Sequence, residues 1–153
     1  MSDDDLTTLH LDQFLAHPPA KVWRALTEPE LLAQWLMPGD FRLEVGHRYT
    51  MRAVPMPGTG FSGTGFSGTV LAEVLAYETG RMLKIGWRDA APGHDTGWTI
   101  TWTLEPEGSG TRLFLLHEGF DPDDPLQRRA RSIMGGGWRS MVLRDLEAAL
   151  ARL

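Results

Sequence analysis

The chain contains no cysteine, and this absence excludes several kinds of chemistry. Without cysteine there is no disulfide framework, no thiolate nucleophile and no cysteine-based metal site. Long apolar runs are missing too, since no stretch approaches the roughly 20 residues that a membrane-spanning helix requires. The first residues are acidic, whereas a secretory signal starts with basic and then apolar residues. We therefore expect a cytoplasmic protein without membrane insertion, in which residues 1–5 are a disordered acidic N-terminus.

Basic residues are fewer than acidic ones, so the net charge is −5 and the sequence pI is near 5.5. This balance disfavours the electrostatic attraction that carries most nonspecific nucleic-acid affinity. The basic cluster at residues 128–131 follows three aspartates, an order that suits a helix dipole better than a phosphate-binding patch. We expect no nucleic-acid partner. Arginine greatly outnumbers lysine, which hints at a GC-rich bacterial genome.

Two motifs that could bind a metal or a cofactor are weak. The histidines lack metal-ligand spacing, so we expect no metal. Residues 58–69 contain Gly-Phe-Ser-Gly-Thr twice and match the dinucleotide pattern G-x-G-x-x-G twice, but prolines interrupt the approach and no helix follows. We expect no cofactor, and we interpret this segment as a mobile loop. Phe61 and Phe66 are candidate lid residues over a cavity mouth, with a neutral insertion as the alternative.

The length of 153 residues suits a single domain, 1–153, that buries a core without cross-links. Apolar residues alternate from residue 6 to 16, which predicts a first strand whose register the pattern leaves open. Leu9, Leu11 and Phe14 are its candidate apolar positions. Further alternation predicts a meander of about six strands, including hairpins of 41–45 with 49–53, 70–77 with 82–88, and 98–104 with 111–118.

Helical patterns stand on both sides of this meander. A proline start predicts a short helix through Leu26, and the capping-box spacing of Thr27 and Glu30 predicts a second helix to about residue 36. An Asp-Pro start at residue 124 predicts a helix that runs to the glycines at 135–137. An amphipathic helix then follows, with Trp138, Val142, Leu143, Leu146, Ala149, Leu150 and Leu153 on its apolar arc. The order of elements is that of an α+β fold whose antiparallel sheet can wrap the final helix.

Several short segments resemble a known family in their order and spacing: residues 19–27, 29–35, 68–71, 113–120 and 136–138. They are similar to the START-like (SRPBCC) superfamily and, within it, to the activator of Hsp90 ATPase homologue 1-like domain family. The resemblance implies a helix-grip, Bet v 1-like fold: a curved antiparallel β-sheet wrapped around a long C-terminal α-helix, with two short helices after the first strand, often over a hydrophobic cavity. It implies no shared catalytic residues, because the superfamily contains ligand carriers, cyclase-like enzymes and co-chaperone domains.

Aromatic residues at predicted inward positions supply a candidate ligand site. Trp87, Trp98, Trp102 and Trp138 are either packed core or the walls of an amphipathic pocket. The complete set of candidate ligand-binding residues is Trp35, Tyr49, Met51, Trp87, Trp98, Trp102, Leu115, His117, Trp138 and Arg139.

Two members of this set are polar and each has more than one interpretation. His117 shares its inward parity with Leu113 and Leu115, so it is a hydrogen-bonded core histidine, a group that orients a ligand, or an acid–base group. No nucleophile or orienting acid accompanies it in the sequence. Arg139 lies inside the apolar arc of the last helix, where it either extends to water or pairs with a ligand carboxylate.

Three functions are consistent with these patterns. The first is binding of a small hydrophobic molecule, lipid-like or aromatic, in a cavity between the sheet and the C-terminal helix, with no catalytic residue assigned. The second is an interaction module in a stress response, in which an Hsp90-like chaperone is the partner. The third is a cyclase- or hydrolase-like enzyme that uses His117.

Overall fold

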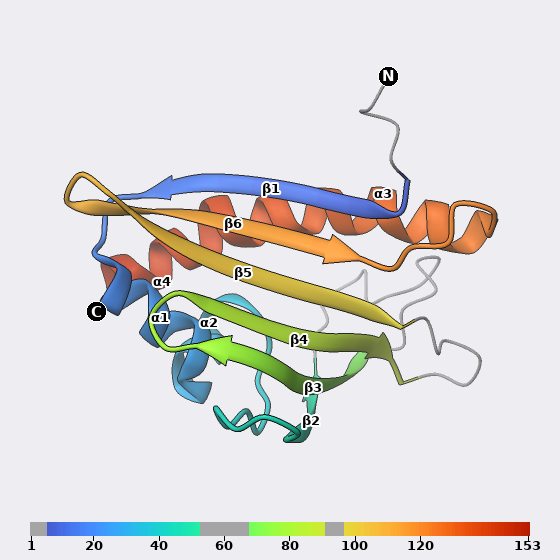
Figure 1. Ribbon diagram of the computed structural model, residues 1–153, viewed down its shortest axis with the longest axis horizontal. Helices are drawn as coiled ribbons and strands as arrows, with labels where there is room; N and C mark the ends of the chain where they lie inside the picture. The colour runs from blue at the N-terminus through green and yellow to red at the C-terminus, as the bar shows by residue number, and fades with distance from the viewer. Residues whose placement is uncertain (1–5, 53–67, 91–96) are drawn as a thin grey trace, which may run out of the picture.

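Six antiparallel strands form one curved sheet in the computed structural model, which describes residues 6–52, 68–90 and 97–153. In spatial order the strands are β1 (Thr8–Leu15), β6 (Gly110–Glu118), β5 (Trp98–Glu107), β4 (Met82–Asp89), β3 (Thr69–Glu78) and β2 (Arg48–Arg52). The helices lie on one side of this sheet, and the long C-terminal helix runs lengthwise behind β1 and β6 (Figure 1). The predicted α+β helix-grip fold is therefore confirmed.

Side-chain alternation decides which face of each strand is buried. In β5 the positions from Trp98 to Leu104 alternate between buried apolar residues and half-buried threonines. Trp102 pairs with Leu83 of β4 and Leu115 of β6, so the buried face of the sheet continues across these three strands. In β1 the same rule places Leu15 in the core and Phe14 on the outer face, where its ring is exposed.

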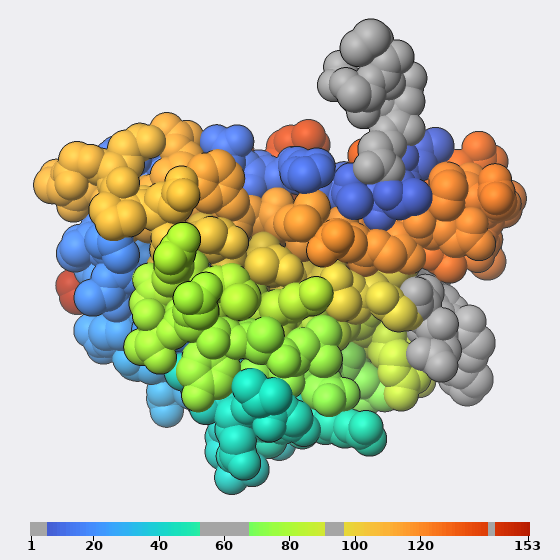
Figure 2. Space-filling model, viewed as in Figure 1, coloured from blue at the N-terminus to red at the C-terminus, as the bar shows by residue number. Residues whose placement is uncertain are grey.

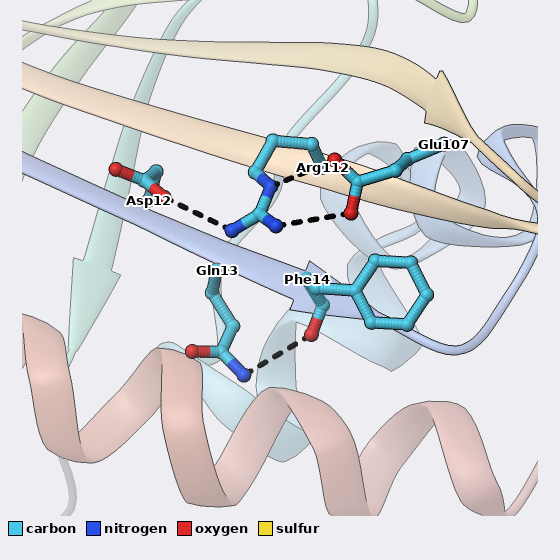
Figure 3. Close-up of polar contacts among 5 residues, drawn as sticks. All are labelled: Asp12, Gln13, Phe14, Glu107 and Arg112. Carbon is cyan, nitrogen blue, oxygen red and sulfur yellow. Dashed lines mark hydrogen bonds and ion pairs between the residues drawn. The ribbon is translucent and has the colours of Figure 1, made fainter.

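The outer face of the sheet, which is turned toward the viewer in Figure 2, carries a charged network that Figure 3 shows in close-up. Arg112 on β6 donates through Nε and Nη2 to the Glu107 carboxylate at 3.2 and 3.0 Å, and through Nη1 to Asp12 at 3.1 Å. Glu107 ends β5 and Asp12 lies on β1, so one guanidinium joins three neighbouring strands. Such planar, two-point pairing is a geometry that arginine provides and lysine does not.

The segment 41–45 is not the strand that its alternation predicts. The Glu44 N–H donates to the Arg42 carbonyl, so the chain turns tightly here. In an alternating strand, Phe41 and Val45 would both face the core. Here Phe41 is buried edge-on against the Tyr49 ring, whereas Val45 is 60% exposed. One buried aromatic residue holds the segment to the core without a strand ladder.

The two short helices are confirmed as α1 (Pro19–Thr27) and α2 (Pro29–Trp35). The predicted capping box between them is wrong. The Thr27 hydroxyl donates to the Trp23 carbonyl at 2.8 Å, inside the last turn of α1, and is not available to cap α2. Glu28 occupies the N-cap position without a side-chain hydrogen bond, and α2 starts with a proline, whose fixed φ suits the first helical position.

The C-terminal helix is continuous, so the predicted break at glycines 135–137 is wrong. It comprises α3 (Pro125–Ser140), the π-helical segment η2 (Met141–Leu146) and α4 (Glu147–Ala151). A π turn accommodates more residues than an α turn and rotates the residues after it around the helix axis. Leu143, expected on the apolar face, lies inside η2 and is 47% exposed, whereas Leu146 at the end of η2 is fully buried.

Core packing draws on both layers, and every tryptophan of the chain is buried. Within residues 6–52, 68–90 and 97–153, no helix has the length and apolar character needed to cross a bilayer. The expected acidic tail at residues 1–5 and the lid candidates Phe61 and Phe66 lie outside the described residues.

Candidate functional site

A buried hydrogen bond connects the sheet to the C-terminal helix. The Nε1–H of Trp138 donates to Nδ1 of His117 at 3.1 Å. His117 is fully buried on the inward face of β6, and Trp138 is the buried residue of α3. The parity of β6 directs His117 inward, and the position of Trp138 on α3 brings the indole over the same part of the sheet.

This bond determines the protonation of His117. An indole N–H can only donate, so Nδ1 must be the unprotonated nitrogen and the neutral ring carries its proton on Nε2. Burial lowers the pKa of His117 to about 3, because the charged imidazolium would lose its hydration in this apolar surrounding. Near neutral pH the side chain is therefore an uncharged hydrogen-bond donor through Nε2.

Two buried N–H groups beside Trp138 have no hydrogen-bond partner among the described residues: His117 Nε2 and Trp102 Nε1. A buried donor without a partner costs roughly 1–3 kcal/mol, so native proteins rarely retain one. The Trp102 and His117 rings lie 6.2 and 6.1 Å from the Trp138 ring, centroid to centroid. Both unpaired donors therefore belong to rings that contact one indole.

Two other indoles of the core besides Trp138 have hydrogen-bond partners, which sets Trp102 apart from them. Trp35 Nε1 donates to the Ala25 carbonyl at 2.8 Å, and Trp98 Nε1 donates to Gln127 Oε1 at 3.2 Å. Gln127 also accepts the backbone N–H of Asp121, and in this way it joins the start of α3 to the sheet. The absence of a partner at Trp102 is thus a local feature and not a general property of the tryptophans in this core.

A pocket of about 520 Å³ lies beside two of these tryptophans, within the size range of small-molecule sites. Its apolar wall consists of Tyr49, Leu71, Ala72, Trp87 and Trp98, which come from β2, β3, β4 and the start of β5. Ala72 stands between larger buried residues of β3, and its short side chain leaves room in the wall.

Charged residues complete the lining of this pocket. Arg48 pairs with Glu73, with 3.4 Å between Nε and Oε1, whereas Arg88 has no acidic partner in the part of the chain that the structure describes. Burial, and secondarily the Asp40 carboxylate, raises the pKa of Tyr49 well above its usual value. Around its apolar wall the pocket thus offers a protonated phenol and, as far as the described residues go, one guanidinium without an ion pair.

The space beneath the C-terminal helix is much smaller. A pocket of about 10 Å³, the room of roughly one water molecule, lies between β1, β6 and α3. Leu9, Leu115, Trp138 and Arg139 are among the residues that line it. The apolar side chains beneath α3 therefore fill this region in the conformation observed.

The residues predicted for the ligand site fall into three groups. Tyr49, Trp87 and Trp98 line the larger pocket, and Leu115, Trp138 and Arg139 line the smaller one. Trp35, Met51, Trp102 and His117 are buried in the core and line neither. Arg139 is exposed, as its interpretation as a side chain extending to water requires.

Sequence reasoning missed the contribution of β3 to the pocket. Leu71 and Ala72 lie on opposite parities of one strand, so a pattern of inward positions cannot select both. The small residue at position 72 between buried valines was the available signal. Within the described ranges, no group of three or more His, Cys, Asp or Glu side chains is placed to hold a metal ion.

The sequence profile of the family described as Activator of Hsp90 ATPase homolog 1-like protein matches residues 16–151. Among solved structures, protein MLL2253 from Mesorhizobium loti is 36% identical, with a TM-score of 0.77 over 95% of this chain and 97% of that one. Protein CV1439 from Chromobacterium violaceum is 25% identical, with a TM-score of 0.72 over 94% of this chain and 96% of that one.

CalU16 from Micromonospora echinospora shares the fold alone, at 22% identity and a TM-score of 0.68, over 94% of this chain and 75% of that one. No curated protein sequence matches the chain. Because the family profile covers almost the whole domain and the arrangement of strands and helices agrees with it, the chain belongs to the family of activator of Hsp90 ATPase homolog 1-like proteins.

Proposed function

We propose that the protein binds a small hydrophobic molecule, lipid-like or aromatic, in the pocket beside Trp87 and Trp98. The observation that carries the proposal is this pocket of about 520 Å³ with two indoles and a phenol in its wall. Aromatic side chains supply large apolar contact areas and a defined stacking geometry for a flat ligand. We expect the ligand to lie next to strands β2 to β5 and not beneath α3, because the space under α3 is only about 10 Å³.

Native mass spectrometry of freshly purified protein is the first test, since a copurified ligand would appear as added mass. Titration with 2-ethylnaphthalene, followed by calorimetry, then measures binding of a defined aromatic probe. We expect Leu71→Glu to weaken this binding about tenfold, because loss of one apolar side chain from the wall removes roughly 1.4 kcal/mol of contact. Arg88 stands opposite position 71 in the β3–β4 register and can pair with the new carboxylate, so the sheet should tolerate the change.

Leu75→Glu is the matched control. Leu75 belongs to the same strand and is exposed, but it does not line the pocket. We expect this variant to bind the probe as the wild type does. Equal affinity of folded Leu71→Glu and wild type would reject the pocket as the binding site.

A contact with an Hsp90-like chaperone is the second candidate function. Besides the family description, the exposed face of α3 favours it: Leu126 is 73% exposed and Ile133 is 43% exposed, and a spacing of seven puts them on one side of the helix. Cosedimentation with purified Hsp90 tests the idea. Replacing both residues with lysine should abolish the contact, whereas Leu71→Glu should leave it intact.

The geometry of His117 favours neither a hydrolase nor a cyclase. Its described hydrogen-bond and ring contacts are with Trp138, Trp98 and Phe120, and none of these residues carries a carboxylate or a nucleophile. A histidine whose pKa is lowered to about 3 also exchanges protons poorly near neutral pH. We therefore propose no acid–base role for it.

A further inference from the structure

We propose that the pocket extends inward when Trp138 moves away from His117, and that His117 Nε2 and Trp102 Nε1 then bind the carbonyl oxygen of an uncharged ligand. The inference rests on the proposed function and specifies its ligand class. That class consists of apolar ketones, quinones and esters, in which one strong acceptor is attached to a hydrophobic body.

The two unpaired donors are the first observation behind this inference. His117 is fully buried and Trp102 is nearly so, yet neither N–H finds an acceptor within residues 6–52, 68–90 and 97–153. A carbonyl oxygen has two lone pairs and can accept from both donors at once. A ligand with such an oxygen would remove the cost of leaving the donors unpaired.

The surroundings of the donors select an uncharged acceptor. The rings around His117 are those of Trp98, Phe120 and Trp138, and the rings around Trp102 are those of Trp35 and Trp138. A carboxylate placed among them would lose its hydration without gaining a cation, which costs far more than burial of a carbonyl. The neutral state of His117 points the same way, because an uncharged ring attracts an anion only weakly.

The donors and the pocket share a wall. Trp87 and Trp98 line the pocket, and their rings lie 5.4 Å from Trp138 and 5.2 Å from His117, respectively. A single layer of indoles therefore separates the pocket from the hydrogen-bonded pair. A ligand stacked on this wall reaches the donors once Trp138 moves away from His117 and the Trp87 and Trp98 rings shift with it.

Trp138 stands on the part of the helix that is best suited to move. Glycines 135–137 precede it, and the π-helical segment η2 follows it closely. A Cβ added at Gly136 or Gly137 would meet no atom within 4 Å, so packing does not require glycine at either position. Glycines weaken a helix, and π segments recur at functional sites, so both features favour local opening around Trp138.

Three probes of one size test the proposal on the full-length protein. 2-Acetonaphthone carries a carbonyl group, 2-ethylnaphthalene lacks any acceptor, and 2-naphthoate carries a charge at neutral pH. We expect 2-acetonaphthone to bind about tenfold more tightly than 2-ethylnaphthalene, from two hydrogen bonds worth roughly threefold each. In ¹⁵N–¹H spectra the indole signals of Trp102 and Trp138, assigned with tryptophan-to-phenylalanine variants, should shift with 2-acetonaphthone only.

Trp102→Phe keeps an aromatic ring and removes one donor, so the preference for 2-acetonaphthone should fall about threefold in this variant. Equal binding of the two uncharged probes, with an unmoved Trp102 signal, would overturn the inference and leave the proposed function standing. Tightest binding of 2-naphthoate would overturn it in favour of a charged ligand at the pocket arginine. Failure of all three probes to bind would remove both the inference and the proposed function.

Discussion

Trp138 and His117 hold the long helix to the sheet through one hydrogen bond of 3.1 Å from the indole N–H to Nδ1. The same bond places the imidazole proton on Nε2, where no described residue accepts it. The pair therefore has two effects: it stabilises the closed structure, and it retains a donor that a ligand can use. Both effects can be measured, through the stability of the protein, its response to pH and the behaviour of the helix that carries Trp138.

Replacing Trp138 with phenylalanine should destabilise the protein more than the same change at Trp102. The first substitution leaves His117 Nδ1 buried without its donor, at a cost of roughly 1–3 kcal/mol beyond the loss of ring volume. Trp102→Phe breaks no hydrogen bond within the described residues and removes an unpaired donor. Urea denaturation of both variants measures the difference. Equal losses of stability would mean that the Trp138–His117 bond contributes little.

The free energy of unfolding should fall as the solution is acidified below about pH 6.5, and His117 should account for part of the fall. Burial lowers the folded-state pKa to about 3 from an ordinary value of 6.5, so between these limits the unfolded chain binds the extra proton. The contribution of uncharged His117 to the free energy of unfolding is thus fully present above pH 6.5. It declines on acidification by up to about 1.4 kcal/mol per pH unit, a slope that vanishes near the lower limit.

His117→Gln provides the comparison for this pH dependence. The glutamine amide does not titrate, and its carbonyl can accept the Trp138 N–H. Urea titrations of both proteins between about pH 5 and pH 7 should show a steeper pH dependence in the wild type, by about 2 kcal/mol across the acidic part of this range. Identical slopes would show that His117 binds its proton as readily in the folded protein as in the unfolded chain, and that burial does not lower its pKa.

Gly136→Ala should stabilise the protein by up to about 1 kcal/mol, because alanine favours helix and the new methyl group meets open space. The same substitution at Gly110 should destabilise it, since the added Cβ would collide with the Leu15 carbonyl oxygen. Thermal unfolding distinguishes the two. If Gly136 also serves opening around Trp138, its alanine variant should bind 2-acetonaphthone more slowly in stopped-flow measurements.

Arg112→Lys should lower stability slightly, and more so at low salt than at high salt. Lysine retains the charge but cannot make the two-point contact with Glu107 while reaching Asp12 (Figure 3). Arg144→Lys is the control, because among the described residues the ion pair of that arginine is with the adjacent Asp145 alone, and Arg144 itself is exposed. A loss at Arg112 that does not respond to salt would indicate lost packing rather than lost ion pairing.

Local patterns predicted the elements whose packing agrees with their own periodicity. The alternation through β5 and β6 placed Trp98, Trp102 and His117 on the buried face, and the structure confirms this. The prediction from alternation was wrong at residues 41–45, where Phe41 is buried but the segment forms no strand. The predicted break at glycines 135–137 was also wrong. The flanking turns of the helix supply enough packing to override the low helix propensity of glycine.

The sequence by itself determined the antiparallel strands, the two short helices, the inward parity of His117 and the amphipathic character of the C-terminal helix, since each depends on residues close together in the chain. Only the tertiary structure decided that Trp138 donates to His117, that Trp102 is left without an acceptor among the described residues, and that the larger pocket lies beside Trp87 and Trp98. The first relation joins α3 to β6, and the pocket is lined by residues of four different strands. These relations depend on strand register and on how the helix docks on the sheet, which no local periodicity specifies.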